Sequence, residues 1–322
     1  MKIKQLGERA LIQRIAGLLS GGSDIVVGAG DDDCAVLDTG GDDHLLVTTD
    51  MLHRKTDFPE QMTARQIGWM SVAVNLSDLA SKGASPIGIV MAMGIPPDTE
   101  VEFIEEVVKG MDECASRYGT HIIGGDTDAH DELTIVGTAL GKVKKGHLIR
   151  RSGARVGDLV CVTGHPGTAG AALFALDKKI PVSQDILKAL FEPVPRIYEG
   201  MALAGTGSVT SMMDISDGLA LSLHDMSMAG SVGFRIYESR LPVLPDVKRL
   251  LKKQELHEAA VFTGGDFELL FTVAPDKIEK ARKACPLTVI GEAVEKGVFI
   301  ERAGRVEELK ARGYEHFRQQ GQ

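Results

Sequence analysis

Three consecutive carboxylates, Asp31 to Asp33, interrupt what would otherwise be a pair of neighbouring apolar strands. The stretch GAGDDDCAVL at residues 28–37 joins the apolar run at 25–27 to the one at 34–37. Adjacent carboxylates repel each other by roughly 1 kcal/mol even in water, and by several times that at a protein surface. A solvated turn rich in Gly and Asp would tolerate this repulsion, and a bound divalent cation would relieve it. Other residues of the chain are needed to choose between a solvated turn and a cation site.

Length and composition indicate a globular protein of two domains. The chain has 322 residues, of which 43% are hydrophobic and 25% charged. No segment approaches the ~20 apolar residues of a membrane span, and the N-terminus becomes amphipathic at once, without the apolar core of a signal peptide. We therefore expect a cytoplasmic protein that has no membrane partner. The four scattered cysteines form no zinc-like spacing, which predicts reduced, structural thiols.

The net charge argues against one class of partner. At −9 the chain lacks the basic surface that nucleic acid requires. A small phosphorylated ligand remains possible, because Mg²⁺ can bridge an acidic site and an anionic nucleotide.

Strand-like and helix-like segments predict a mixed α/β (α+β) fold. In the first half we expect strands at 25–27, 34–38, 44–49, 87–94, 120–123 and 133–143, and helices at 6–20 and 63–82. A capping box of Thr99 with Glu102 predicts a third helix that ends near Tyr118. The apolar periodicity lapses at 144–157, so we divide the chain into an N-terminal domain, 1–147, and a C-terminal α/β domain, 148–322. In the latter we expect helices at 168–177 and 217–229 and strands near 158–162, 209–214, 232–236 and 267–273.

Carboxylates recur at the edges of these apolar elements, in several cases beside a hydroxyl. The positions are Thr48, Thr49 and Asp50 at the end of a strand, Asp78 within a helix, Asp126 beyond a strand, and Asp214 and Asp217 around a strand-to-helix turn. Each has an ordinary interpretation as a helix cap, a turn residue or part of a polar helix face. Together they are the oxygen ligands that hard cations such as Mg²⁺ prefer.

Familiar catalytic motifs do not account for these residues. The sequence has no G-x-x-x-x-G-K-[ST], no G-x-S-x-G and no H-E-x-x-H, which disfavours P-loop, serine-hydrolase and zinc-hydrolase chemistry. The stretch VTGHPGTAGAAL has a strand, a Gly-rich loop and a helix N-terminus, a geometry that can receive phosphate but also serves as a plain connection.

Eight motifs in order resemble the thiamine-monophosphate kinase family, within the superfamily of aminoimidazole ribonucleotide synthetase. They are GDDDCAVL, TTDML, VNLSDLASKGASP, GGDT, RSGARVGD, MDISDGL, GGDFELLFT and the terminal GYEHF, and the match as a whole extends from Gly28 to Phe317. The resemblance implies ATP-dependent phosphorylation of thiamine monophosphate to thiamine diphosphate with several Mg²⁺ ions. It also implies a homodimer whose N-terminal strands form a barrel between subunits. We expect that dimer on physical grounds too, because strands 34–38 and 44–49 would present edges that must be covered.

Carried over position by position, the resemblance implies three sets of site residues. The metal ligands would be Asp33, Thr48, Thr49, Asp50, Asp78, Asp126, Asp214 and Asp217. Gly125, Asp126, Arg151 and Ser216 would bind ATP, and Asp57, Asp266 and Phe317 would contact the substrate. No catalytic base is expected, because the attacking phosphate oxygen is already ionised at neutral pH.

The chain departs from the family pattern at three places. The first motif carries one acid more than usual, which leaves the register of Asp32 and Asp33 open by one position. GGDFELLF has one acid fewer, which leaves the role of Asp266 open, and Asp57 stands where a substrate-contacting histidine is common. Because a carboxylate would repel the substrate phosphate, we expect Arg54 or Lys55 to bind that phosphate, with Asp57 a loop residue or a contact to the cationic rings.

Superfamily relatives are the nearest alternatives. Selenophosphate synthetase and the hydrogenase-maturation relative would each require a cysteine-bearing terminal segment that this sequence lacks. Aminoimidazole ribonucleotide synthetase, or a non-catalytic nucleotide-binding relative, remains as an alternative, distinguished by the 52–58 loop or by ATP turnover.

Overall fold

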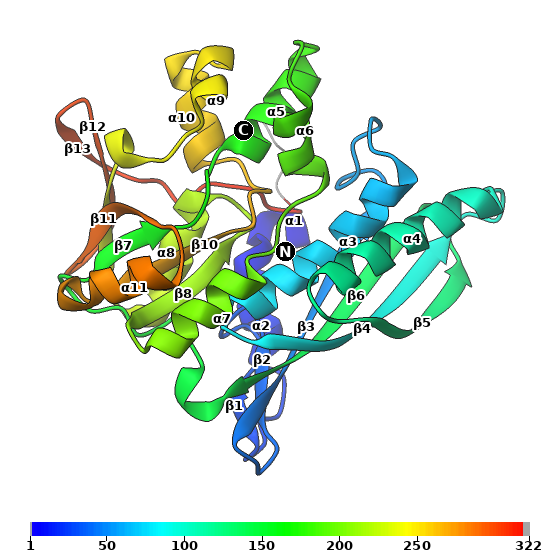
Figure 1. Cartoon of the computed structure of the whole chain (residues 1–322), viewed down its shortest axis with the longest axis horizontal. Helices are drawn as coiled ribbons and strands as arrows, with labels where there is room; N and C mark the ends of the chain where they lie inside the picture. Colours follow the sequence, from blue (N-terminus) through cyan, green and yellow to red (C-terminus); the bar gives the residue numbers. More distant parts are fainter. Residues whose placement is uncertain (1, 318–322) are drawn as a thin grey trace.

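Two mixed sheets and their helices make up the protein. A computed structural model describes residues 2–317 (Figure 1). The first sheet has the order β1 (Ile25–Val27), β2 (Ala35–Asp38), β3 (Asp43–His53), β6 (Thr134–Lys144), β4 (Ser85–Ile95) and β5 (Ile122–Ala129). Only β4 and β5 run parallel.

The second sheet comes from the C-terminal half. Its order is β13 (Arg305–Glu308), β12 (Val298–Arg302), β9 (Gly233–Tyr237), β11 (Thr288–Val294), β7 (Leu159–Val162), β10 (Glu268–Val273) and β8 (Val209–Ile215). The strands pair antiparallel except for β9 with β12. The expected two-domain mixed α/β architecture is therefore confirmed.

Helices connect and cover the sheets. In chain order the α-helices are α1 (Ile3–Leu6), α2 (Glu8–Ala16), α3 (Ala64–Ser81), α4 (Val101–Arg117), α5 (Thr168–Lys178), α6 (Gln184–Phe191), α7 (Ile197–Thr206), α8 (Leu219–Gly230), α9 (Pro245–Leu250), α10 (Lys253–Val261) and α11 (Ile278–Ala284). Short 3₁₀ turns lie at Lys145–His147, Glu238–Arg240 and Pro275–Lys277. None of the helices in residues 2–317 combines the length and the apolar character needed to cross a membrane.

Helix α3 lies at the centre of the molecule, between the two sheets (Figure 1). It packs on β3 and β6 of the first sheet and on α7 and β8 of the C-terminal half. Most of its residues are buried, because it has apolar or small side chains on all sides. The polar residues it carries are therefore held in fixed places within the protein.

One face of the first sheet has no helix over it among the described residues. Helices α3 and α4 cover the other face (Figure 1). On the uncovered side, which we call the outer face, Met51 is 53% exposed and Val90 is 37% exposed.

Four expectations about the elements are wrong in detail. The helix expected at 6–20 is broken at Gly7, whose φ of 83° leaves the right-handed helical region, and its second part ends at Ala16. Thr99 does not cap α4, whose N-cap is Glu100 without a side-chain bond; a true capping box joins Thr63 and Gln66 at α3.

The other two differences concern strands. The strand expected at 120–123 extends to Ala129, so that Asp126 lies within β5 rather than beyond it. Strands β2 and β3 are interior, since the sheet edges are β1 and β5. The edge argument for a dimer therefore does not hold. The four cysteines are unpaired and buried, as expected.

Candidate active site

Carboxylates from both domains meet beside α3. Asp50 comes from β3, Asp78 from α3, and Asp214 and Asp217 from the end of β8 and the turn after it. Burial and the neighbouring charges Asp50 and Asp214 raise the pKa of Asp78 well above its ordinary value. These four residues, which we call the acid cluster, lie within electrostatic reach of one another.

The same causes act on the other members. Burial, followed by repulsion from Asp217, raises the pKa of Asp50 to about 6. Burial, followed by repulsion from Asp33, raises the pKa of Asp214 to about 7, although the Ser77 hydroxyl donates to it at 2.5 Å. Burial raises the pKa of Asp217 to about 6, against the opposing charge of Arg9. The acid cluster thus carries more negative charge than its surroundings neutralise.

The two threonines before Asp50 point in opposite directions, as successive side chains of a strand must. The Thr48 hydroxyl donates to Asp78 and lies 3.2 Å from the Asp33 carbonyl, so Thr48 belongs with the acid cluster. The Thr49 hydroxyl donates to the Gly137 carbonyl at 2.8 Å and is exposed with the outer face.

Asp126 is not part of the acid cluster in one copy of the chain. It pairs across the sheet with Ala92, which pairs with Val136, which pairs with Met51. It is therefore exposed on the outer face, where its carboxylate accepts the Thr127 amide at 3.0 Å.

The donor set suits a hard cation, although the protein alone does not complete a site. Carboxylates and a hydroxyl are oxygen ligands, and their mutual repulsion is what a divalent cation would relieve. Within residues 2–317, no three His, Cys, Asp or Glu side chains already converge as a metal site. A cation here would take its remaining oxygens from water and phosphate.

Asp33 is surrounded differently from the acid cluster. One of its oxygens accepts from Arg151, and the other accepts from Ser81 at 2.8 Å and lies 2.9 Å from Lys82. These cations outweigh burial and hold the pKa of Asp33 well below its usual range. Asp31, in contrast, is exposed. Of the first three carboxylates, Asp32 and Asp33 therefore have internal partners, which the sequence did not predict.

Arg151 and Ser216 flank this region. The Arg151 Nε is buried without a hydrogen-bond partner, which leaves one donor of the guanidinium unused. The Ser216 carbonyl accepts from the Gly265 amide at 2.7 Å, so the loop after β8 is bonded to the residue before Asp266.

Asp266 is engaged with backbone. Its two oxygens accept from the amides of Gly167, at 2.6 Å, and Ala169, at 3.1 Å. It therefore holds the N-terminus of α5, where a negative charge is favourable. Burial nevertheless raises its pKa to about 7.

The loop at 53–58 has its shape fixed by Asp57. That carboxylate accepts from the His53 amide at 2.8 Å and from the Thr56 hydroxyl at 2.7 Å. Lys55 is exposed and 3.5 Å from Glu132, whereas Arg54 has a buried Nη1 that lacks a partner. The structure thus separates the two basic residues that the sequence left equivalent.

The terminal segments meet near Asp217. The Tyr314 amide donates to the Asp217 carbonyl at 3.0 Å, and its ring hydroxyl is close to Thr56 and Asp57. Phe317, in contrast, is 42% exposed.

Helix α2 adds residues that the sequence interpretation missed. The Arg9 Nη2 lies 3.3 Å from Asp217 and 2.7 Å from Asp225, and Glu8 accepts the His316 amide at 3.0 Å. No periodicity could have revealed these contacts, because they join segments more than 200 residues apart.

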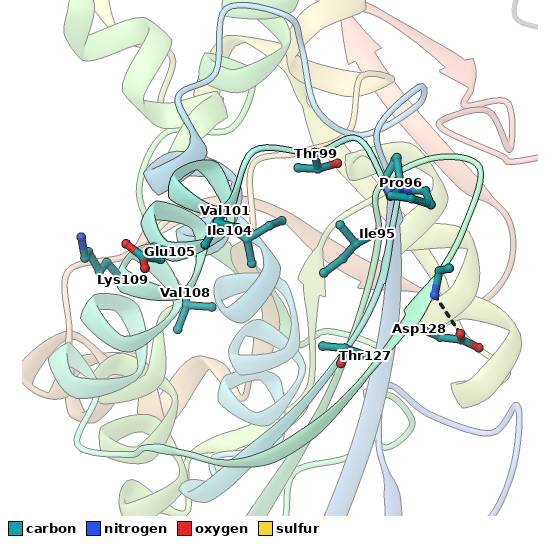
Figure 2. A pocket seen from close by; sticks show the side chains of 12 residues that line it. Ile95, Pro96, Thr99, Val101, Ile104, Glu105, Val108, Lys109, Thr127 and Asp128 are labelled. Atoms are coloured by element: carbon teal, nitrogen blue, oxygen red, sulfur yellow. Dashed lines mark hydrogen bonds between the residues drawn. The ribbon is translucent and has the colours of Figure 1, made fainter.

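A pocket of about 770 Å³ opens between α4 and the ends of β4 and β5 (Figure 2). Its lining is mainly apolar, with Ile104 and Val108 of α4 on one side and Ile95 of β4 and Thr127 and Asp128 of β5 on the other. In β5 its lining begins at Thr127, one residue after Asp126, whose own side chain lies on the opposite, outer face.

Comparison with known proteins identifies the family. The two domain models of AIR synthase related protein match this chain, the N-terminal one at residues 31–143 and the C-terminal one at 155–303. The thiamine-monophosphate kinase of Methanospirillum hungatei is 45% identical over 88% of this chain and 92% of its own length. That of Halobacterium salinarum is 39% identical over 89% and 92%.

A solved structure gives the same result. The one described as AaThiL complexed with AMPPCP and TMP has a TM-score of 0.85 and 27% identity, and the match covers 98% of this chain and 99% of that one. The chain with these two sheets and this acid cluster belongs to the thiamine-monophosphate kinase family.

Proposed function

We propose that the protein transfers the γ-phosphoryl group of ATP to the phosphate of thiamine monophosphate, producing thiamine diphosphate and ADP. The observation that carries this proposal is the acid cluster, where four carboxylates from both domains meet without enough positive charge. The curated relatives bear the name of this activity.

Mg²⁺ is the cofactor that fits the acid cluster. Asp50, Asp78, Asp214, Asp217 and the Thr48 hydroxyl would hold it, and Thr49 and Asp126 would supply oxygens on the outer face. When bound, the metal neutralises phosphate charge and so allows two polyanions to approach each other. The number of Mg²⁺ ions bound would depend on how many phosphate oxygens join these ligands.

The nucleotide base fits the pocket between α4 and β5. Ile95, Ile104 and Val108 offer apolar contact to a purine ring (Figure 2). The phosphates would then follow β5 past Gly125, where the absence of a side chain leaves the backbone accessible. Arg151, with one unused donor, and Ser216 lie on the side of Asp33 and Asp214 and would receive the terminal phosphates.

The substrate fits between the 53–58 loop and the C-terminal segment. The unpartnered Nη1 of Arg54 is a donor for the substrate phosphate. Tyr314, with Asp57 and Asp217 around it, offers an aromatic face and negative charge to the cationic thiazolium ring. Phe317 would cover the rings from the same segment, and Asp266 would act indirectly, through the N-terminus of α5.

The chain's own part in the reaction is positioning. Arg54 and Arg151 would align the acceptor and donor phosphates for in-line transfer, which itself accounts for much of the rate of such reactions. The acceptor oxygen is already ionised, so no residue needs to remove a proton.

We also propose that two copies of the chain associate through the outer face of the first sheet. Met51 and Val90 expose apolar surface there, and one face of a sheet is rarely left apolar and open to water. Thr49 and Asp126 lie on the same face, so this association would enclose two site residues that a single copy leaves exposed. Residues 1–147 would then form the dimerisation domain and 148–322 the second domain.

A coupled assay tests the proposed activity. We expect purified protein with Mg²⁺ to convert thiamine monophosphate and ATP to thiamine diphosphate and ADP in equal amounts, and we expect chelation of the metal to stop the reaction. Consumption of ATP with another phosphorylated substrate, but not with thiamine monophosphate, would indicate a superfamily relative such as aminoimidazole ribonucleotide synthetase instead. Binding of ATP without turnover of either substrate would indicate a non-catalytic relative.

A further inference from the structure

Lys82 is the largest side chain in the described chain that solvent does not reach. A lysine is almost never buried to this extent unless its charge is paired. Its ammonium donates to Asp32, lies 2.9 Å from Asp33, and donates to the Met212 carbonyl at 3.0 Å. All three of its donors are therefore used.

The oxygens of the two carboxylates, Asp32 and Asp33, likewise all have partners within the protein. Asp32 accepts from Lys82 with one oxygen and from the Arg151 amide, at 2.8 Å, with the other. Asp33 accepts from Arg151 and from Ser81. The side chains of both aspartates are less than 5% exposed. Two buried carboxylates thus have one buried cation, Lys82, and one partly buried cation, Arg151, and neither carboxylate needs a further partner.

We propose that Lys82 is a built-in cation that does for Asp32 and Asp33 what a metal ion would otherwise do. Asp33 is then a positioning residue, not a metal ligand, and the metal ions bind at Asp50, Asp78, Asp214 and Asp217. This second half rests on the proposed metal dependence. The first half concerns the metal-free protein alone.

The position of Lys82 connects this ion pairing to the acid cluster. Lys82 caps the C-terminus of α3, and Met212 lies in β8, two residues before Asp214. The loop that carries Asp32 and Asp33 precedes β2 of the first sheet. Through Lys82 the N-terminal loop, α3 and β8 are connected at one point, so Asp214 is held in register with Asp50 and Asp78 across the two domains.

The first experiment replaces Lys82 in protein freed of metal by EDTA. Removal of one partner of a buried ion pair leaves a buried charge uncompensated. We expect Lys82→Met, which keeps an unbranched side chain only one atom shorter, to lower the melting temperature by at least about 5 °C. The matched control is Lys145→Met, because Lys145 pairs with Asp38 at 2.8 Å on the surface; we expect a change of about 1 °C or less.

A second variant keeps the test decisive if Lys82→Met folds poorly. Asp32→Asn combined with Lys82→Met restores the charge balance, so we expect the double variant to melt above Lys82→Met alone. A melting temperature of Lys82→Met equal to or above that of the parent, or a double variant less stable than the single one, would overturn the role of Lys82.

Titration with Mg²⁺ alone, followed by calorimetry, tests the role of Asp33. We expect Asp33→Asn to keep the affinity for Mg²⁺ within about threefold of the parent, and Asp78→Asn to lose about tenfold or more. In EDTA we expect the melting temperature of Asp33→Asn to be lower than that of the parent and the melting temperature of Asp78→Asn to be higher. Equal losses of Mg²⁺ affinity would make Asp33 a ligand and refute the proposal, while leaving the kinase assignment intact. A parent that binds no Mg²⁺ would refute the proposed function, and the melting comparison in EDTA would still decide the role of Lys82.

Discussion

At the scale of single residues, the carboxylates of the site form two groups that differ in whether positive charges of the protein neutralise them. Asp32 and Asp33 have Lys82 and Arg151 within the protein, whereas Asp50, Asp78 and Asp214 have mainly other carboxylates as charged neighbours, Asp33 and Asp217 among them. The sequence could place every one of these aspartates at the edge of an apolar element, because strand and helix periodicity are local. It could not show which carboxylate faces a cation, because Lys82 is 50 residues from Asp32 and Arg151 is 118 from Asp33.

The 53–58 loop yields a prediction at this scale. We expect Arg54→Ala to raise the KM for thiamine monophosphate by about tenfold, the effect of one lost charge-assisted hydrogen bond, with little change in the KM for ATP. Lys55→Ala is the matched control, because its ammonium is exposed and already close to Glu132, and its effect should be under about twofold. Steady-state kinetics with each substrate varied separately measures both. A larger effect from Lys55 than from Arg54 would contradict this assignment.

At the scale of elements, the strands were easier to predict than the way they assemble. Short apolar runs located β1, β2 and β3 to within a few residues, but the order β1-β2-β3-β6-β4-β5 makes β2 and β3 interior strands. Sheet order depends on pairings such as that of β3 with β6, which begins 81 residues beyond β3 at its nearest approach, His53 with Thr134. Local patterns contain no information about such partners. The expectation of a dimer therefore rests on the exposed outer face of the first sheet, and no longer on strand edges.

The outer face gives a prediction that belongs to this scale. We expect the parent protein to be a dimer and Val90→Asp to shift it to monomer, because a buried carboxylate without a partner opposes association. Met228→Asp is the control, since Met228 is 68% exposed on α8, away from that face. Light scattering at micromolar concentration distinguishes the two masses. A monomeric parent, or an equal effect of both variants, would contradict dimerisation through this face.

At the scale of the whole molecule, the acid cluster joins the two domains across α3. Asp50 and Asp78 belong to the first domain, and Asp214 and Asp217 to the second. Repulsion among them acts between the domains in the metal-free protein. The stability of the whole chain should therefore depend on anything that changes the charge of this cluster, including protons and metal ions.

The dependence on protons has a definite sign. The folded protein raises the pKa values of Asp50 and Asp217 to about 6 and that of Asp214 to about 7, above the ordinary value of 3.8. Between about pH 4 and pH 7 the folded state thus binds more protons than the unfolded state, so the free energy of unfolding falls as pH rises. Asp33 does not change this window, because its lowered pKa affects stability only at more acidic pH.

We therefore expect the melting temperature in EDTA to fall by several degrees between about pH 5 and pH 8, since one unit of pKa shift corresponds to about 1.4 kcal/mol. The stabilisation by Mg²⁺ should grow over the same range, because the ionised carboxylates that destabilise the metal-free protein are the form that binds the cation. We expect Asp50→Asn to reduce the pH dependence of the melting temperature in EDTA and to weaken the stabilisation by Mg²⁺. Asp38→Asn, at the surface pair with Lys145, should leave both quantities unchanged. Differential scanning calorimetry at matched ionic strength measures these changes. If metal-free protein instead melts at steadily higher temperature as pH rises from 5 to 8, the carboxylates are not held together by the fold as the structure shows, and metal binding cannot be what relieves them.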